Sequence, residues 1–195
     1  VASTGVGNRP AVEMRREELA HILRAAARIA GDDEILVIGS QAILGSFWED
    51  DLPEVAWLSI EVDVAFIDDP GARKADLVDG AIGELSEFHQ HNTYYAQGVE
   101  VSAAILPLGW RDRLVTFTDT AAEPARAVCL EPHDLVISKL AAQREKDFAF
   151  AAALLAAGLV DPSLLLERAN LLSDDHGVVR SAIIRWIESA ARKRP

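Results

Sequence analysis

Cysteine is nearly absent from this chain, in which Cys129 is the single thiol among 195 residues. One cysteine excludes an internal disulfide framework and fits a protein that folds in a reducing cytosol. Cys129 lies in an apolar run that extends from Ala127 to Leu130, which favours a buried packing role over a nucleophilic one. The sequence also lacks a Cys-x-x-Cys pair, a Gly-rich P-loop and a recognisable Ser-His-Asp arrangement.

Long hydrophobic runs are missing as well. No apolar stretch approaches the roughly 20 residues that cross a bilayer, and the sequence does not open with a positively charged, apolar leader. We therefore expect a soluble, cytoplasmic protein with no membrane partner. Hydrophobic residues nevertheless make up 50% of the chain, which is enough for a sizeable core.

Positive charge is scarce. The chain has 19 Lys and Arg residues against 31 Asp and Glu residues, which gives a formal net charge of −12. This balance argues against broad, nonspecific binding of nucleic acid, which requires a positive surface. It still allows a local basic patch, a substrate held through a bound metal ion, or a basic partner protein.

The first part of the chain predicts a tail, a helix and a strand. Residues 1–11 are small and polar and contain Gly and Pro, so we expect a mobile tail. Apolar residues recur at helical spacing from Val12 to Ala30, which predicts an amphipathic helix that ends at Gly31. A short buried strand is predicted for Glu34 to Ile38, and a short helix for Ser40 to Phe47.

A Gly-Ser turn joins this predicted strand to the short helix. One interpretation is an ordinary strand-to-helix turn in which Ser40 is the helix N-cap. In the other, Gly39 allows a close approach of the backbone and Ser40 binds a phosphate at the helix start. The dipeptide alone does not distinguish the two.

Two acidic residues follow on a second predicted strand. Apolar and polar residues alternate strictly from Leu58 to Phe66, so Glu61 and Asp63 share the face opposite the apolar one. Two neighbouring carboxylates repel one another unless a cation lies between them. Mg²⁺ is commonly held by one or two carboxylates together with waters and substrate phosphates. The pattern therefore indicates a magnesium site.

The middle of the chain predicts one helix and three more strands. The helix is expected from Ala72 to Leu85, and the strands from Val99 to Leu106, Arg113 to Thr118 and Ala125 to Leu130. A metal pair on a strand could be formed by His89 and His91. Because no third nitrogen or sulfur ligand is placed to help them, we favour surface or capping roles.

The last third of the chain is helical. Pro132 follows Glu131 at a predicted helix start. The expected helices are His133 to Ala157, Pro162 to Leu172 and Gly177 to Lys193. The overall pattern predicts an α+β protein with a mixed α/β core over residues 12–130 and a helical lobe over residues 131–195.

The first of these helices has a charged stripe. Lys139, Gln143 and Asp147 are spaced by four residues, and Lys146 lies beside them. Such a mixture of charges is typical of an amphipathic helix with salt-bridged flanks. Alternatively, Lys139 points at a triphosphate as a localised charge, and Asp147 completes the site.

The Gly-Ser turn and the acid pair together resemble the nucleotidyltransferase superfamily that includes the DNA polymerase β-like enzymes. The segment from Asp134 to Asp147 resembles the lysine- and aspartate-bearing helical motifs of the AbiEii/MenT toxins. Those proteins are the nucleotidyltransferase halves of bacterial toxin–antitoxin systems. The resemblance covers roughly Glu34 to Ala157. It implies a nucleotidyltransferase-like mixed sheet core, a C-terminal helical lobe and an active site between them.

The resemblance also implies roles for individual residues. The triphosphate of an NTP would be bound by Gly39 and Ser40, and Lys139 and Arg144 would contact the nucleotide. Toxins of this family transfer nucleotides to the 3′ end of tRNA and are encoded beside a cognate antitoxin. The implied partners are therefore an NTP, a tRNA acceptor and an antitoxin protein.

The same resemblance assigns the carboxylates. Glu61 and Asp63 would ligate Mg²⁺, while Asp63, Lys139 and Asp147 would be catalytic, with Asp147 on the metal or acting as a base. The first metal ligand is Glu where the family usually has Asp, and no third metal carboxylate can be placed on a later strand. The separation of Ser40 from Glu61 is also longer than usual, so we expect a loop to bulge out at residues 45–57.

Two other functions are compatible with these features. The Glu61 substitution allows a catalytically inactive, nucleotide-binding module. The acidic composition allows a nucleotidyltransferase that acts on a protein or on a cationic small molecule. An RNA acceptor would require basic residues around the site, and the best candidates are Arg144, Lys146, Arg111 and Arg113.

Overall fold

A computed structural model describes residues 14–192 of the chain, so the predicted tail at residues 1–11 lies outside the described part. The described α-helices are α1 (Arg16–Ala30), α2 (Arg73–Ile82), α3 (Glu87–Asn92), α4 (Pro132–Ala142), α5 (Glu145–Ala156), α6 (Pro162–Asn170) and α7 (Gly177–Arg192). The strands are β1 (Glu34–Val37), β2 (Glu61–Ala65), β3 (Tyr95–Gly98), β4 (Val115–Thr116) and β5 (Arg126–Cys129). Short 3₁₀ helices fill several of the connections, the longest being Ser40–Gly45.

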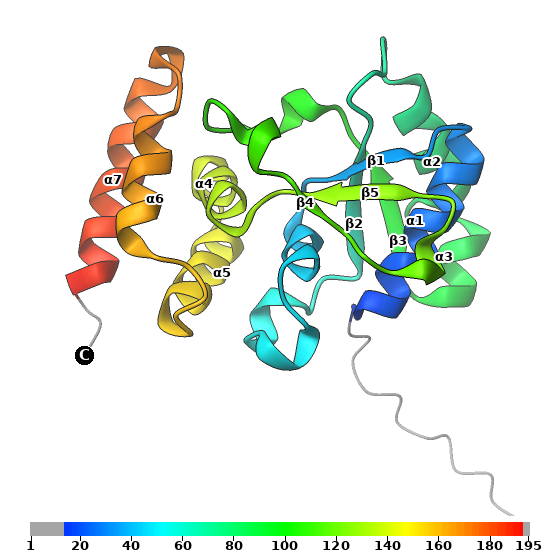
Figure 1. The fold of residues 1–195 in the computed structure, drawn as a ribbon, viewed down its shortest axis with the longest axis horizontal. Coiled ribbons are helices and arrows are strands. Elements are labelled where there is room, and N and C mark those ends of the chain that lie inside the picture. Colours follow the sequence, from blue (N-terminus) through cyan, green and yellow to red (C-terminus); the bar gives the residue numbers. More distant parts are fainter. Residues whose placement is uncertain (1–13, 193–195) are drawn as a thin grey trace, which may run out of the picture.

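The five strands form one mixed sheet in the order β3-β2-β1-β5-β4 (Figure 1). Strand β1 pairs antiparallel with β2 and parallel with β5. The outer strands β3 and β4 pair parallel with β2 and antiparallel with β5, respectively. In Figure 1, α1, α2 and α3 lie to the right of the strands, where α1 and α2 pack on the sheet, and α4 to α7 lie to their left. This arrangement confirms the predicted α+β fold.

Helix α1 packs against α2 and strands β1, β2 and β3. It does so through the apolar stripe that its sequence predicts. The side chains of Leu19, Ile22 and Leu23 are fully buried. The helix ends at Gly31, which adopts a left-handed conformation with φ of 64°. The predicted start, Val12, lies outside the described residues; within them the helix begins at Arg16, and the Glu18 carboxylate accepts a hydrogen bond from the Arg15 amide at its start.

Strand β2 shows the predicted alternation. Val62 and Val64 are fully buried, while Glu61 and Asp63 lie on the other face and are only partly buried. The strand is shorter than predicted, since it begins at Glu61 rather than Leu58. The segment before it forms short 3₁₀ helices at Glu49–Asp51 and Glu54–Ala56, in the region where a bulging loop is expected.

The strand predicted from Val99 to Leu106 is wrong, because the third strand lies earlier, at Tyr95–Gly98. A strand needs a hydrogen-bonding partner along its length, and β2 ends at Ala65, opposite the end of β3. Beyond that point Val99 and Ile105 pack against the core from an irregular segment instead. The segment that contains His89 and His91 is helix α3, so these residues do not form a pair on a strand.

The single helix predicted from His133 to Ala157 is also wrong, because it is two helices. Helix α4 ends at Gln143, whose φ of 58° is left-handed, and Arg144 is extended before α5 begins. A residue in that conformation cannot continue a helix. The charged stripe predicted for Lys139, Gln143 and Asp147 on one helix therefore does not exist.

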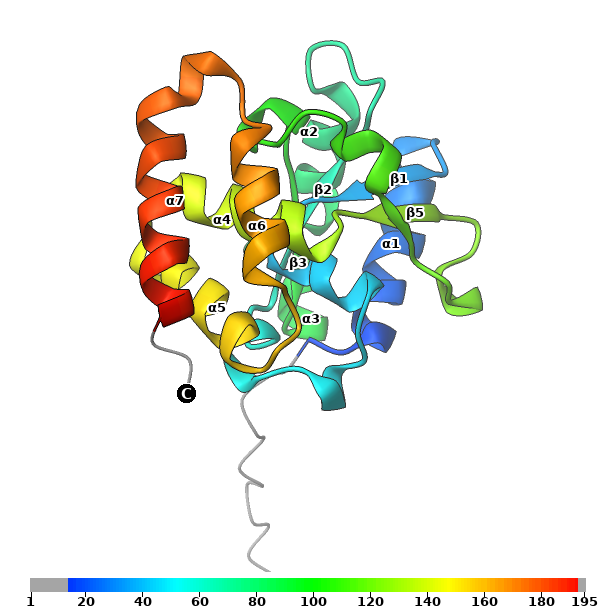
Figure 2. The same cartoon turned by 60° about the vertical axis from the view of Figure 1, so that its left-hand side comes forward.

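The helices α4 to α7 pack together beside the sheet, and α6 and α7 lie next to one another (Figure 2). Helix α4 begins at Pro132 as predicted, and the Glu131 carboxylate accepts hydrogen bonds from the His133 and Asp134 amides. The same helix also packs against the 3₁₀ helix Ser40–Gly45. The division into a core and a lobe at residue 130 stays a prediction. Within residues 14–192, no helix is both long and apolar enough to cross a membrane.

Candidate active site

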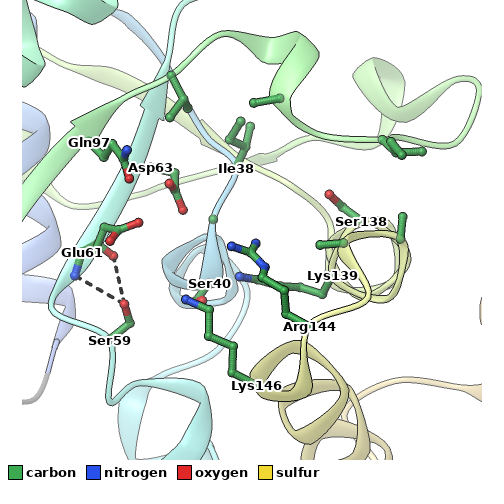
Figure 3. Close-up of a pocket in the computed structure, with 16 residues that line it drawn as sticks. Ile38, Ser40, Ser59, Glu61, Asp63, Gln97, Ser138, Lys139, Arg144 and Lys146 are labelled. Carbon is green, nitrogen blue, oxygen red and sulfur yellow. Dashed lines mark hydrogen bonds between the residues drawn. The ribbon is translucent and has the colours of Figure 1, made fainter.

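One pocket of about 320 Å³ lies between the sheet and the corner where α4 meets α5 (Figure 3). It is lined by sixteen residues from four parts of the chain: Ile38, Gly39 and Ser40 after β1; Ser59, Glu61 and Asp63 at β2; Gln97, Val99, Ala103 and Ile105 from β3 onward; and Ser138, Lys139, Ala141, Ala142, Arg144 and Lys146 at the corner. Six of the seven predicted site residues therefore line one cavity. The seventh, Asp147, does not.

Gly39 lies against the acid pair. A Cβ atom on Gly39 would be 1.6 Å from Oδ2 of Asp63, a distance that no side chain could tolerate. Its φ of −82° is available to any residue, so the close approach and not the backbone conformation demands glycine. Gly39 also occupies the N-cap position of the 3₁₀ helix, which removes the interpretation of Ser40 as N-cap.

The two carboxylates face the pocket from neighbouring outward positions on β2. Burial, and then the negative charge of Glu61, raise the pKa of Asp63 from 3.8 to about 6. The positive charges of Lys139 and Arg144 act in the opposite direction but do not cancel this rise. The pair therefore attracts a cation, whose binding would remove the repulsion between the carboxylates.

Three cationic side chains reach the pocket from the α4–α5 corner. Figure 3 shows Lys139, Arg144 and Lys146 extending toward the side of the pocket that holds Glu61 and Asp63. The Lys139 side chain is 12% exposed, whereas that of Arg144 is 60% exposed. A negatively charged ligand that enters the pocket would thus meet one largely buried ammonium group and two exposed cations at the rim.

Asp147 lies behind these cations and is almost completely buried. Its Oδ2 accepts a hydrogen bond from Arg144 Nε at 2.8 Å, and its Oδ1 is 3.3 Å from Lys139 Nζ. The contact between Lys139 and Asp147 arises because the chain turns between α4 and α5. With both oxygens engaged by cations, Asp147 is placed to hold Lys139 and Arg144, and this geometry favours a positioning role over that of a metal ligand or a base.

The donor set fits Mg²⁺. Residues 14–192 contain no cluster of three or more His, Cys, Asp or Glu side chains that could hold a metal ion by themselves. Glu61 and Asp63 supply two carboxylates, and Mg²⁺ usually completes its six ligands with waters and substrate phosphates. The missing side chain of Gly39 leaves room for the Asp63 carboxylate itself, which lies against the turn and lines the pocket where such an ion would be held.

Several pocket residues have no signal in the sequence alone. Gln97 lies beside Asp63 because the two residues are partners in the β2–β3 register. That pairing could be found only by placing β3 correctly. Ser59 also lines the cavity and belongs to no motif, while Ser138 lies within the Asp134 to Asp147 segment, in which the resemblance assigns it no role.

Two of the four candidates for an RNA-facing patch lie elsewhere. Arg113 is engaged by the buried Asp134, to which its Nε donates a hydrogen bond at 2.8 Å. Arg111 lies over the ring of Trp110, with 5.3 Å from the guanidinium carbon to the ring centroid. Neither lines the pocket, so the basic rim consists of Arg144 and Lys146 beside the less exposed Lys139.

Comparison with known proteins agrees with this geometry. The family model described as a nucleotidyltransferase of unknown function (DUF6036) matches residues 17–171. No curated protein and no solved structure matches the chain. The match confirms the predicted superfamily, while the AbiEii/MenT subtype stays a prediction. Since the match covers most of the sequence, the chain belongs to this family of nucleotidyltransferases of unknown function.

Proposed function

We propose that this protein is a Mg²⁺-dependent nucleotidyltransferase that moves a nucleotide from an NTP to an acceptor hydroxyl. The observation that carries the proposal is the pairing of opposite charges across one pocket. Two carboxylates, Glu61 and Asp63, face three cations, Lys139, Arg144 and Lys146. This is the arrangement that a metal–triphosphate complex requires, because the carboxylates hold the ion and the cations balance the remaining phosphate charge.

The residues of the chain act mainly by positioning and electrostatics, as is usual in phosphoryl-type transfer. Bound Mg²⁺ supplies charge neutralisation at the phosphates. Lys139 donates hydrogen bonds to phosphate oxygens, and Asp147 holds it in place from behind. Ser40 and the backbone at Gly39, which line the pocket close to the ends of Lys139 and Lys146 (Figure 3), would contact the phosphates from the turn after β1.

The chemical step forms a bond between the acceptor oxygen and the α-phosphorus, and pyrophosphate leaves. The acceptor hydroxyl gives its proton to a base. Asp147 is engaged by both Lys139 and Arg144, so it is poorly placed for this task. A carboxylate oxygen of Glu61 or Asp63 that is not on the metal is better placed to accept this proton, since both side chains line the pocket.

We further propose that the acceptor is the 3′ end of tRNA and that the protein is a growth-inhibiting toxin with a cognate antitoxin. The support is the resemblance of the Lys139 to Asp147 segment to the AbiEii/MenT toxins, together with the exposed cations at the rim. Arg144 and Lys146 can contact a phosphate of the acceptor strand, since both are exposed.

A second candidate acceptor is a cationic molecule or a protein hydroxyl. The segment between Ser40 and Glu61 has four acidic residues, Glu49, Asp50, Asp51 and Glu54, and it joins the pocket through Ser59. None of these four forms an ion pair within residues 14–192, and three of them are exposed. Uncompensated negative charge near a pocket attracts a cation and repels RNA.

The test is incubation of the protein with Mg²⁺, each labelled NTP in turn and total tRNA. Label on the 3′ end of tRNA supports the first proposal, and the label should be lost by at least about 100-fold in Asp63→Asn and in Lys139→Ala. Asp76→Asn, an exposed change on α2, is the matched control and should behave as wild type.

Other outcomes separate the alternatives. Label that appears on proteins or aminoglycosides but never on tRNA would favour the second acceptor. Calorimetric binding of a Mg²⁺–NTP complex without turnover on any acceptor would instead indicate an inactive binding module. Unchanged labelling of tRNA by Asp63→Asn would contradict the assignment of the site.

A further inference from the structure

The Glu61 carboxylate has a hydrogen-bond partner that lies outside the pocket lining. The phenol of Tyr95 donates to Oε2 of Glu61 at 2.8 Å. Tyr95 is on β3 and is the direct partner of Glu61 in the parallel register with β2. The contact is therefore fixed by the pairing of two strands rather than by a flexible loop.

Tyr95 is itself held rigidly. Its side chain and backbone are buried, with a relative exposure of 9%. Its amide donates to the carbonyl of Ile60 at 3.0 Å, and the ring of His89 lies 4.7 Å from its own ring, centroid to centroid. These contacts fix the position of the phenolic oxygen beside the Glu61 carboxylate.

A glutamate needs such a partner more than an aspartate does. Glu61 has one more rotatable bond than Asp63, and a free glutamate loses that rotamer freedom when it binds an ion. A donor on one carboxylate oxygen removes the freedom in advance and leaves the other oxygen, Oε1, for the ion. Preorganisation of this kind strengthens binding without adding a contact to the ion.

We propose that Tyr95 is a positioning residue, whose hydroxyl aims the Glu61 carboxylate at the divalent cation bound between Glu61 and Asp63. The inference rests on the proposed function, because it needs the two carboxylates to be a cation site. It goes beyond that function by assigning to a residue outside the pocket lining a role in cation affinity. Tyr95 does not touch the ion or the nucleotide.

The test separates the hydroxyl from the ring. Tyr95→Phe keeps the buried ring and removes only the donor. Mn²⁺ prefers the same oxygen ligands as Mg²⁺ and can be counted by electron paramagnetic resonance, so its affinity is measured directly with and without a non-hydrolysable NTP. We expect Tyr95→Phe to weaken Mn²⁺ binding by about 10-fold.

Tyr94→Phe is the matched control. The Tyr94 hydroxyl also makes a side-chain hydrogen bond of 2.8 Å, to Nδ1 of His21, but it lies away from the pocket. Removing it should leave Mn²⁺ affinity unchanged. A thermal melt of both variants shows whether either change disturbs the fold.

A double-mutant cycle tests whether Tyr95 acts through Glu61. In Glu61→Asp the carboxylate is one methylene shorter and moves away from the phenol. Adding Tyr95→Phe to this variant should then change Mn²⁺ affinity by less than about 2-fold, because coupled changes are not additive. A purely structural tyrosine would weaken binding equally in both backgrounds, and that result would overturn the inference.

The remaining outcomes distinguish the inference from the proposed function. If Mn²⁺ binds the wild type, fails to bind Asp63→Asn and binds Tyr95→Phe as tightly as wild type, the inference is wrong and the proposed function stands. If the wild type binds no Mn²⁺ even with the NTP analogue, both are wrong.

Discussion

The space that a side chain of residue 39 would occupy is filled by the Asp63 carboxylate, and residue 39 is a glycine. In Gly39→Ala the new methyl group would overlap Oδ2 of Asp63, so the carboxylate or the turn must move. We expect the displaced carboxylate to lower cation affinity and nucleotidyl transfer by at least about 100-fold, since a shift of about 1 Å is enough for such a loss. Calorimetry with Mn²⁺ and the labelled-NTP assay measure the two effects.

Gly80→Ala is the control for this change. Gly80 is on α2, and a Cβ atom there would meet nothing within 4 Å. The substitution should leave activity unchanged and stabilise the protein by roughly 0.5–1 kcal/mol, because alanine is the better helix former. If Gly39→Ala also kept its activity, the close approach of the turn to Asp63 would have no functional meaning.

The raised pKa of Asp63 predicts a pH dependence of function. Protonated carboxyl groups do not hold a divalent cation, so Mg²⁺-dependent activity should fall as the pH drops through about 6. In a profile of kcat/KM against pH measured at Mg²⁺ well below saturation, where bound metal does not lower the apparent pKa, the acidic limb should have its midpoint near that value. A midpoint near 4, the ordinary value for a carboxyl group, would show that burial and Glu61 do not raise the pKa.

The raised pKa of Asp63 also affects the stability of the metal-free protein, which should decrease, unlike activity, as the pH rises. The pKa of Asp63 in the folded protein lies above the unfolded value of 3.8, so folding favours the protonated form. As the pH rises through about 6, Asp63 becomes charged in the folded protein and the free energy of unfolding decreases. Without divalent cations, Asp63→Asn should therefore melt at a higher temperature than wild type above that pH. The gain is at most about 3 kcal/mol. The difference in stability between Asp63→Asn and wild type should vanish below pH 3.8. Thermal melts of both proteins across the pH range measure it.

At the scale of elements, the corner between α4 and α5 places the cations. Asp147 connects the two helices through Lys139 on α4 and Arg144 at the start of α5. Asp147→Asn removes a buried charge that both cations share. We expect a loss of about 3 kcal/mol in the free energy of unfolding and about 10-fold weaker NTP binding, because removing one member of a buried ion pair leaves the other uncompensated. Denaturant titration and calorimetry measure the two effects.

Asp174→Asn is the matched control for that variant. Asp174 also pairs with an arginine, Arg180 at 3.1 Å, but its side chain is 99% exposed. Exposed ion pairs contribute little to stability, so this change should alter neither unfolding nor NTP binding. Equal effects of the two substitutions would show that Asp147 does not organise the corner.

Local patterns in the sequence predict most elements of this fold and fail where long-range pairing decides. The period of two places Glu61 and Asp63 on one face of β2, and the helical period identifies α1. The apolar residues from Val99 to Leu106 look like a strand, yet β2 ends before it can pair with them. Strand pairing depends on where the partner ends, and no local pattern contains that information.

The candidate site shows the same limit. The spacing of Lys139 and Asp147 predicts that they share one face of a continuous helix, whereas their actual contact depends on the break at Gln143. Gln143 is not glycine, so nothing marks the break beforehand. Tyr95 carries no motif, and its contact with Glu61 follows only from the β2–β3 register.

At the scale of the whole molecule, the distribution of charge matters more than its total. The net charge is −12, yet Lys139, Arg144 and Lys146 gather at one corner beside a single pocket. An anionic ligand is therefore repelled by most of the surface and attracted at one place. Such a distribution suits a small, metal-bound triphosphate and limits how much of a nucleic acid the protein can cover.

The sheet side and the helical side of the molecule are joined by a buried carboxylate, Asp134 on α4. Both of its oxygens accept hydrogen bonds from Arg113, which precedes β4, and its Oδ1 lies 3.4 Å from Nε of Arg168 on α6. Asp134→Ala would leave both arginines without this partner, so we expect the free energy of unfolding to fall by about 3 kcal/mol in a single thermal transition. Glu34→Ala, which breaks the exposed pair with Arg126, should leave the melting temperature unchanged. Two separate transitions in wild type would show that the two sides unfold independently and that Asp134 does not couple them.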